Sequence, residues 1–167
     1  MLEQEPPEQV QHIWTEHHAS STHLVASTLQ AEAFRRFCAT ARAHPLFVLP
    51  VPKGTQGGFV SFLLQCQLPY VICTLLEEYQ RRGAAAQPHL VVSHYDELVD
   101  KKGIVLVRGE LVTSTNLDVG EAARLVGHMH AFYTEPEGQA VVADFNRGAA
   151  SFDFSAVLNK CGVQPHA

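Results

Sequence analysis

The stretch Lys102-Gly103-Ile104-Val105-Leu106-Val107-Arg108-Gly109-Glu110 decides the fold of this chain. Its aliphatic residues, 104–107, leave no polar face, so a strand made from them needs cover on both sides. The preceding residues, 95–102, carry acids early and lysines in the last turn, and Gly103 occupies the position of a left-handed C-cap. We therefore predict a short helix that ends at this glycine and leads into a central, covered strand, which continues to Leu111 or Val112.

The composition is that of one globular domain. The chain has 167 residues, of which 46% are hydrophobic and 17% are charged. We expect a disordered lead-in at residues 1–8, a folded domain at 9–160 and a tail at 161–167. A net charge of −5 without a basic stripe argues against a nucleic-acid partner. No apolar run reaches the roughly 18 residues that span a membrane, and the acidic, proline-bearing start shows no import presequence.

Outside the central block, the hydrophobic pattern alternates between strand and helix periods. Residues 46–51 form a short apolar strand, which Pro50 and Pro52 confine to an edge of the sheet or to an irregular segment. Residues 59–67 place apolar side chains at even positions, so this strand has one face open to water or to a partner. The other predicted segments are strands at 70–75 and 90–95, helices at 9–18, 30–43, 139–146 and 152–158, a helical turn at 76–82 and a flexible turn at 53–58.

The clearest helix begins at Asp118, which fits the acidic variant of a capping box together with Glu121. Its apolar positions recur at helical spacing and are Ala122, Leu125, Val126, Met129, Phe132 and Tyr133. Glu135-Pro136 ends this helix. The order of helices, strand cluster, strand–helix–strand and helices predicts an α+β fold with a mixed, largely antiparallel sheet and helices packed mainly on one face.

The sequence contains no recognisable catalytic or metal-binding motif. The closest histidine pairs, His17-His18 and His128-x-His130, do not place two ligands on one side of a helix. Cys66 and His94 are conceivable as a nucleophile–base pair, but the apolar register of Cys66 favours a core position. We expect no catalytic residue, metal or cofactor, and we favour a binding role. The four scattered cysteines are expected to be reduced and buried; they are Cys38, Cys66, Cys73 and Cys161.

Candidate contact residues lie where apolar or charged side chains adjoin predicted turns. Leu49, Pro50, Phe59 and Tyr70 flank exposed turns, where they form either the edge of the core or a docking surface. Arg108 and Glu110 are two residues apart on a strand and therefore share a face. They are either a solvated ion pair at a strand end or contacts for a partner.

An ordered series of short blocks resembles a known family. The blocks are Ile13-Trp14 with His17-His18, Phe47-Val48-Leu49-Pro50-Val51-Pro52, Gln65-Cys66-Gln67, Leu76-Glu77-Glu78-Tyr79, Pro88-His89-Leu90, His94-Tyr95-x-Glu97-Leu98, the quoted stretch from Lys102 to Glu110, Glu121-Ala122, Phe132-Tyr133 and Asp144-Phe145-Asn146. With these blocks in order over roughly residues 10–158, the chain resembles the mitochondrial ATP synthase F(1) complex assembly factor one family, the chaperones of the ATP synthase β subunit. It departs from the family in its short acidic N-terminus and its short loops at 53–58 and 135–139.

The resemblance implies a chaperone of the mitochondrial matrix that is monomeric when free and needs no cofactor. Such a protein binds the unassembled β subunit, shields the surface that later faces an α subunit, and leaves when α arrives. The open face of the sheet and the loops around Leu49-Pro50 and Phe59 are the expected contact. Two alternatives are a small α+β enzyme that uses a His or Cys site and an interaction module that serves another complex.

Overall fold

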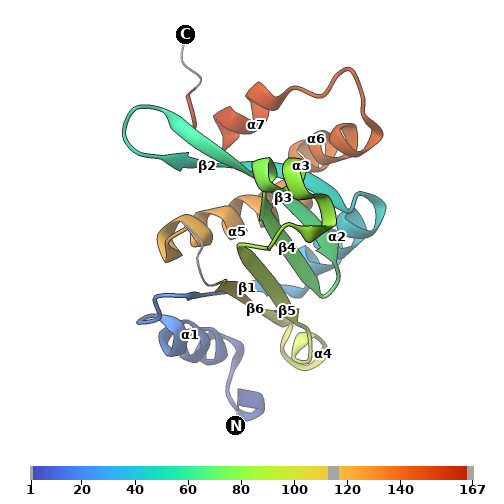
Figure 1. Ribbon diagram of the computed structural model, residues 1–167. Coiled ribbons are helices and arrows are strands. Elements are labelled where there is room, and N and C mark those ends of the chain that lie inside the picture. Colours follow the sequence, from blue (N-terminus) through green and yellow to red (C-terminus); the bar gives the residue numbers. More distant parts are fainter. Residues whose placement is uncertain (1, 113–116, 165–167) are drawn as a thin grey trace.

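A six-stranded sheet forms the centre of the structure, a computed structural model that describes residues 2–112 and 117–164 (Figure 1). In chain order its strands are β1 (Leu24–Gln30), β2 (Leu46–Lys53), β3 (Gly58–Gln67), β4 (Tyr70–Leu75), β5 (Leu90–Tyr95) and β6 (Ile104–Leu111). The helices are α1 (Pro7–His18), α2 (Ala31–Ala43), α3 (Leu76–Arg82), α4 (Val99–Lys102), α5 (Val119–Thr134), α6 (Pro136–Arg147) and α7 (Phe154–Lys160), with 3-10 turns η1 (Leu2–Gln4) and η2 (Gly83–Ala85). This arrangement confirms the predicted α+β fold.

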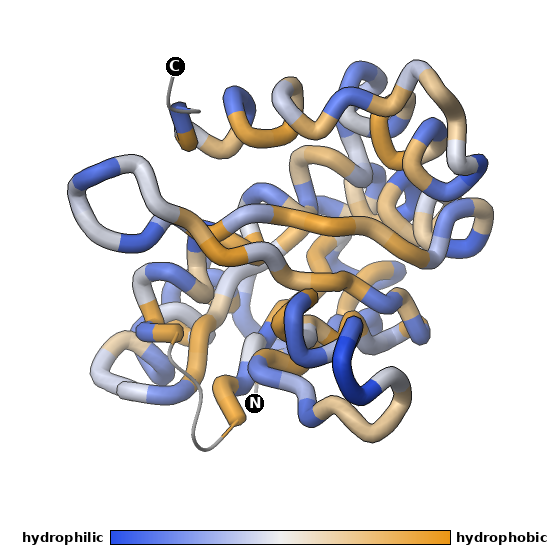
Figure 2. Tube along the Cα trace, turned by 45° about the horizontal axis from the view of Figure 1, so that its top comes forward, coloured by the Kyte–Doolittle hydropathy of each residue, from blue (hydrophilic) through white to orange (hydrophobic). Residues whose placement is uncertain are grey.

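The strands follow the order β1-β6-β5-β4-β3-β2, and every pairing between them is antiparallel. Strand β2 is an edge strand, as its prolines predicted. Strand β6 lies inside the sheet, between β5 and the edge strand β1. Figure 2 shows that hydrophobic residues concentrate along the strands, whereas the turn between β2 and β3 is hydrophilic.

The main core lies between one face of the sheet, here called the inner face, and helices α2, α5 and α6. The predicted apolar positions of α5 are all buried in it, with no exposed fraction above 3%. The predicted capping box is also present, because Asp118 accepts from the Glu121 amide and Glu121 accepts from the Asp118 amide. Glu121 pairs in addition with Lys53 of β2 at 2.8 Å, which ties the start of α5 to the sheet.

Strand β6 is covered on both faces, as its apolar run predicted. The four residues 104–107 are each no more than 6% exposed. Val107 belongs to the main core, whereas Ile104 and Leu106 form a second cluster with Val10 of α1 on the opposite face of the sheet. Gly103 has φ of 67°, which is the left-handed C-cap predicted for it. The helix before this cap is shorter than expected, because residues 97–98 form a turn.

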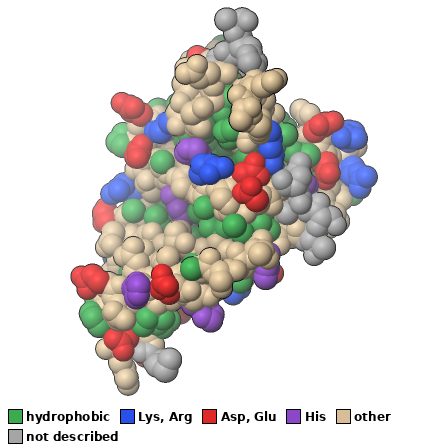
Figure 3. All heavy atoms as spheres, turned by 90° about the vertical axis from the view of Figure 1, so that its left-hand side faces the viewer, with side chains coloured by type: hydrophobic (Ala, Val, Ile, Leu, Met, Phe, Trp, Pro, Cys, Tyr) green, Lys and Arg blue, Asp and Glu red, His purple; other side chains and the backbone are tan. Residues whose placement is uncertain are grey.

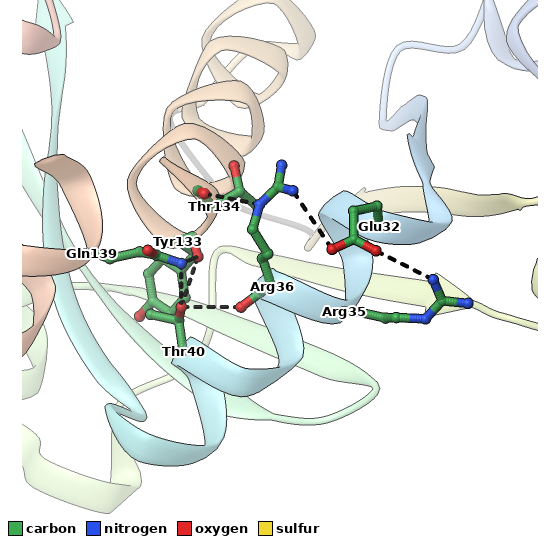
Figure 4. Close-up of polar contacts among 7 residues, drawn as sticks. All are labelled: Glu32, Arg35, Arg36, Thr40, Tyr133, Thr134 and Gln139. Atoms are coloured by element: carbon green, nitrogen blue, oxygen red, sulfur yellow. Dashed lines mark hydrogen bonds and ion pairs between the residues drawn. The ribbon is translucent and has the colours of Figure 1, made fainter. Parts of the chain in front are cut away.

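Side chains from α2 and α6 hold the C-terminal end of α5 (Figure 4). Thr40 Oγ1 lies 2.8 Å from Tyr133 O, and Arg36 Nε donates to Thr134 O at 3.1 Å. Gln139 Nε2 donates to Tyr133 O at 3.2 Å and to Thr40 Oγ1 at 3.1 Å. The last carbonyl groups of a helix have no intrahelical donors, so these bonds supply partners that α5 would otherwise lack.

The structure differs from the sequence predictions mainly at element boundaries and at β1. Strand β1 was not predicted, because its mixture of small, polar and aliphatic residues is only half buried. Helix α1 begins at Pro7 instead of residue 9, since proline is well suited to the first turn of a helix. A 3-10 turn at Leu2–Gln4 also occupies the expected lead-in. Cys161 and Val163 are buried, so the packed part of the chain extends into the expected tail.

A buried pair of histidines connects the inner face to the turn before β4. His94 Nδ1 lies 3.0 Å from Pro69 O, and His94 Nε2 lies 3.0 Å from His130 Nε2. Because a carbonyl oxygen only accepts, His94 donates from Nδ1 and accepts at Nε2 from His130. Burial lowers the pKa of both rings, and that of His130 falls to about 3, with the nearby His94 adding to the effect. Both histidines are therefore neutral at physiological pH, and Phe37 packs against both.

Replacing Gly138 with alanine should destabilise the protein, whereas the same change at Gly127 should not. A Cβ at Gly138 would lie 2.5 Å from the Cα atom and 2.7 Å from the carbonyl oxygen of Phe132, so α6 would have to move away from α5. Overpacking of this kind costs about 1–3 kcal/mol. A Cβ at Gly127, exposed on α5, meets no atom within 4 Å, and alanine there should add about 0.5–1 kcal/mol. Thermal unfolding of both variants checks this, and equal Tm values would contradict the close helix contact.

Replacing His130 with glutamine should make stability less dependent on pH. The folded-state pKa of His130, about 3, lies below its ordinary value of 6.5. Below pH 6.5 the unfolded chain therefore binds the extra proton, and stability is lost as the pH falls, by about 2 kcal/mol at pH 5. The measurement is the free energy of unfolding in urea at several pH values between about 7.5 and 5. Its slope against pH should be smaller in His130→Gln than in the wild-type protein, by the contribution of about one proton. Identical slopes in the two proteins would refute a neutral His130.

Candidate partner-binding face

The sheet face opposite the main core, here called the outer face, carries alternate side chains of every strand. Directly opposed residues of antiparallel strands share a face. One row on the outer face consists of Gln67, Tyr70, Ser93, Arg108 and Ala26. The neighbouring row consists of Leu46, Gln65, Ile72, Val91, Glu110 and Leu24. The register therefore brings side chains from distant parts of the chain into two adjacent lines.

The four exposed members of these rows (Leu46, Gln67, Tyr70 and Glu110), together with the half-buried Gln65, Ile72 and Arg108 beside them, form a mixed apolar and polar surface that we call the outer patch. Tyr70 is 49% exposed and Leu46 is 42% exposed, more than any other large hydrophobic residue in the described part of the chain. The outer patch comprises Leu46, Gln65, Gln67, Tyr70, Ile72, Arg108 and Glu110. Amide and charged side chains thus lie between exposed apolar ones, which is the composition of a protein surface that meets a partner.

An aromatic stack beneath α1 borders the outer patch on the β6 side. The guanidinium carbon of Arg108 lies 5.7 Å from the centroid of the Tyr95 ring, and Trp14 packs edge-on against that ring at 6.0 Å. Trp14 Nε1 donates to Val107 O at 3.0 Å, which fixes α1 over this part of the sheet. The stack restrains the Arg108 side chain through its contact with the ring face. Sequence reasoning missed the stack, because no local pattern relates residues so far apart in the chain.

A hollow borders the outer patch on the side of α3 and η2. Its volume is about 290 Å³. Polar groups of Gln65, Gln67, Thr74 and Tyr79 line it together with the apolar side chain of Ile72. All of the described lining residues are uncharged, so the hollow suits a neutral side chain or a backbone amide of a partner.

Three of the six predicted contact residues lie together, namely Tyr70, Arg108 and Glu110, which all belong to the outer patch. Arg108 packs on Tyr95, and within the described part of the chain no ion pair joins Arg108 to Glu110. Of the two alternatives considered for these charges, the ion pair between them does not form in this structure. Their side chains remain separate groups on the same face.

The other three predicted contact residues lie elsewhere. Leu49 is fully buried on the inner face, so its placement on a docking surface is wrong, and it is a core residue. Pro50 belongs to the outer face by register but is buried. Phe59 is 38% exposed and its ring lies 6.2 Å from that of Phe154. It sits at the far end of β3, roughly 26 Å along the strand from Gln67.

The pairing of Cys66 with His94, considered from the sequence, does not form. The Cys66 thiol donates to the Tyr133 hydroxyl at 3.6 Å, whereas His94 is bonded to His130 and Pro69. Burial raises the pKa of Cys66 to about 11, so the sulfur is protonated at neutral pH and is a poor nucleophile. The four cysteines are free, as predicted; Cys38, Cys73 and Cys161 are buried, whereas Cys66 is only half-buried.

In the part of the chain that the structure describes, charged groups and histidines are distributed without a cluster that suggests a metal site. Among the described residues, no group of three or more His, Cys, Asp or Glu side chains is placed to hold a metal ion. On the side of the molecule drawn in Figure 3, acidic and basic side chains lie next to one another and histidines are spread apart. Within residues 2–112 and 117–164, none of the helices has both the length and the apolar character needed to cross a membrane.

Comparison with known proteins places this fold in a family. The family model described as "ATP11 protein" matches residues 1–158. "Protein atp11, mitochondrial" of Schizosaccharomyces pombe is 30% identical over 146 residues, which are 80% of this chain and 50% of that protein. "ATP synthase mitochondrial F1 complex assembly factor 1" of Homo sapiens is 30% identical over 160 residues, which are 95% of this chain and 48% of that protein. The chain thus spans about half the length of the curated relatives it matches, and it belongs to the ATP11 protein family.

Proposed function

We propose that this protein is an assembly chaperone that binds the unassembled β subunit of the mitochondrial ATP synthase F(1) sector. It keeps the β subunit from aggregating, hands it over to the α subunit, and works in the mitochondrial matrix. The observation that carries the proposal is the family match over residues 1–158, together with relatives whose names contain "mitochondrial" and "F1 complex assembly factor". The β subunit as partner and the handover to α are the finer parts of this proposal.

The outer patch supports a role in binding another protein. Binding energy at interfaces comes mostly from a few Trp, Tyr and Arg residues. Tyr70, Arg108, Tyr95 and Trp14 lie close together at the outer patch and the stack beside it. We place the centre of the contact at Tyr70 and Arg108, with Glu110 beside them. Phe59 belongs to its periphery, because it lies at the other end of β3, whereas Pro50 is buried and lies outside the contact.

Capture of an unassembled subunit needs no chemical step. A subunit without its neighbour exposes an apolar interface, which aggregates unless another surface covers it. A cover that occupies the same interface as the next subunit is released when that subunit competes for it. The interleaved amide and charged groups of the outer patch suit such a temporary cover, because they keep an exposed binding face soluble when it is free.

Co-expression tests the proposed partner directly. The F(1) β subunit is produced alone or together with this protein, and the soluble fraction of β is measured. We expect soluble β to increase several-fold and to co-purify with the protein, and adding the α subunit should then release it. Unchanged solubility of β, with no co-purification, would refute the proposal.

Replacing Tyr70 with aspartate should abolish capture without unfolding the protein. A charged side chain at the centre of an interface removes a hot spot, which costs at least about 2 kcal/mol, or roughly 30-fold in Kd. Because Tyr70 is half exposed, its replacement should change Tm little. Affinity for the β subunit is measured by titration with the purified protein.

The matched control is Ala140→Asp, which adds the same charge at an exposed position of α6. This variant should bind β as the wild-type protein does. Phe59→Asp should weaken binding less than Tyr70→Asp does. If the wild-type protein and Tyr70→Asp bind the β subunit with equal affinity, the outer patch is not part of the contact.

A further inference from the structure

The two edges of the sheet differ in how their outward backbone groups are occupied. In an antiparallel pair, the backbone N–H and C=O groups of every second residue bond to the neighbouring strand. The backbone groups of the residues between them point away from that strand, here called outward. The Cys66 amide donates to Pro45 O, so in β2 the outward positions are Leu46, Val48, Pro50 and Pro52. The Leu111 amide donates to His23 O, so in β1 they are Leu24, Ala26, Thr28 and, at the end of the strand, Gln30.

The β2 edge is protected at three of its four outward positions. Asn146 of α6 caps Leu46, because its Oδ1 accepts from the Leu46 amide at 3.1 Å and its Nδ2 donates to the Leu46 carbonyl at 2.6 Å. Pro50 and Pro52 have no N–H to offer. Capping side chains and prolines are the devices by which proteins keep a sheet edge from pairing with other chains.

The β1 edge has no comparable protection along its middle. The Leu24 amide donates to Ser21 Oγ at 2.9 Å, which occupies the first outward position. Within the described residues, no hydrogen bond involves the outward N–H and C=O groups of Ala26 and Thr28. Both residues are half-buried, not enclosed. An edge strand with free groups is a template for a further strand.

We propose that the β1 edge binds an extended strand of the partner polypeptide, which extends the sheet to a seventh strand. The inference rests on the proposed function, since the partner is the captured β subunit. The free N–H and C=O groups of Ala26 and Thr28 recur every second residue, roughly 6.6 Å apart, and an extended backbone has the complementary spacing. Main-chain bonding of this kind is β-augmentation.

The position of this edge favours a strand of the partner over a second copy of this chain. The row that contains Tyr70 and Arg108 ends at Ala26, so a strand added beside β1 extends the same row of the sheet, at an edge over which α1 also packs. Leu24 extends the neighbouring row beyond Glu110 in the same way. One partner can therefore contact the face of the sheet and pair with its edge at once.

The variant Ala26→Pro tests whether a strand of the partner pairs with the β1 edge. The Ala26 amide points outward and takes no part in the bonds to β6, so proline should leave the ladder intact, as Pro50 and Pro52 do in β2. We expect affinity for the F(1) β subunit to fall by about tenfold or more, because a backbone donor is lost and the approach of a strand is blocked. The matched control is Val48→Pro, at an outward position of the β2 edge, which should bind β normally.

Hydrogen exchange provides a second readout that does not depend on a variant. In the complex of the wild-type protein with β, the amides of Ala26 and Thr28 should exchange at least about tenfold more slowly than in the free protein. The proposed strand pairing at the β1 edge is refuted if the protein captures β while exchange at both amides and the affinity of Ala26→Pro stay unchanged. The proposed function would still hold in that case. A free protein that dimerises in solution and is made monomeric by Ala26→Pro would also overturn the proposed strand pairing, since the edge would then serve self-association. Failure of the wild-type protein to capture β refutes the proposed function itself.

Discussion

The need of strand β6 for cover on both faces determines most of this structure. Residues 104–107 have no polar side, so the sheet must be buried around them from both directions. Helices α2, α5 and α6 cover the inner face, and α1 covers the outer face over β1 and β6, with Trp14 reaching Tyr95 of β5. Helix α3 covers part of β3 and β4. The outer patch lies on the part of the outer face that these two helices leave uncovered. The candidate site therefore exists because helices cover this face of the sheet only in part.

Local patterns in the sequence were sufficient for the elements whose burial is regular. The capping box and apolar stripe of α5, the polar–apolar alternation of β3 and the glycine after α4 each depend on neighbours within a few residues. Strand β1 lacks such a pattern, because Ala26, Ser27 and Thr28 are small or polar and half exposed. The face on which Leu49 lies depends on the register with β3, and a run of apolar residues between prolines does not fix that register.

The candidate site was predictable only for residues that share one strand. Arg108 and Glu110 lie on the same face because they are two apart, and Tyr70 was identified from its position beside a turn. Their approach to one another across β4, β5 and β6, and the packing of Arg108 on Tyr95, come from long-range pairing. Long-range pairing also joins His94 to His130 and to the carbonyl of Pro69, so the residue just before Tyr70 is bonded to a side chain of the core. The turn that leads into the outer patch is thus tied to the core.

The short free stretch of the β1 edge suits reversible binding. Its two outward residues offer four hydrogen bonds, and each contributes about 1 kcal/mol net. Association alone costs at least about 4 kcal/mol, so a strand added at this edge gains almost nothing by itself. We therefore expect that two copies of the chain do not pair stably through β1, and that a partner strand stays bound there only when the partner also covers the outer patch. Loss of the contact with the outer patch is then enough for release, which is the behaviour that a temporary cover on an assembling subunit requires.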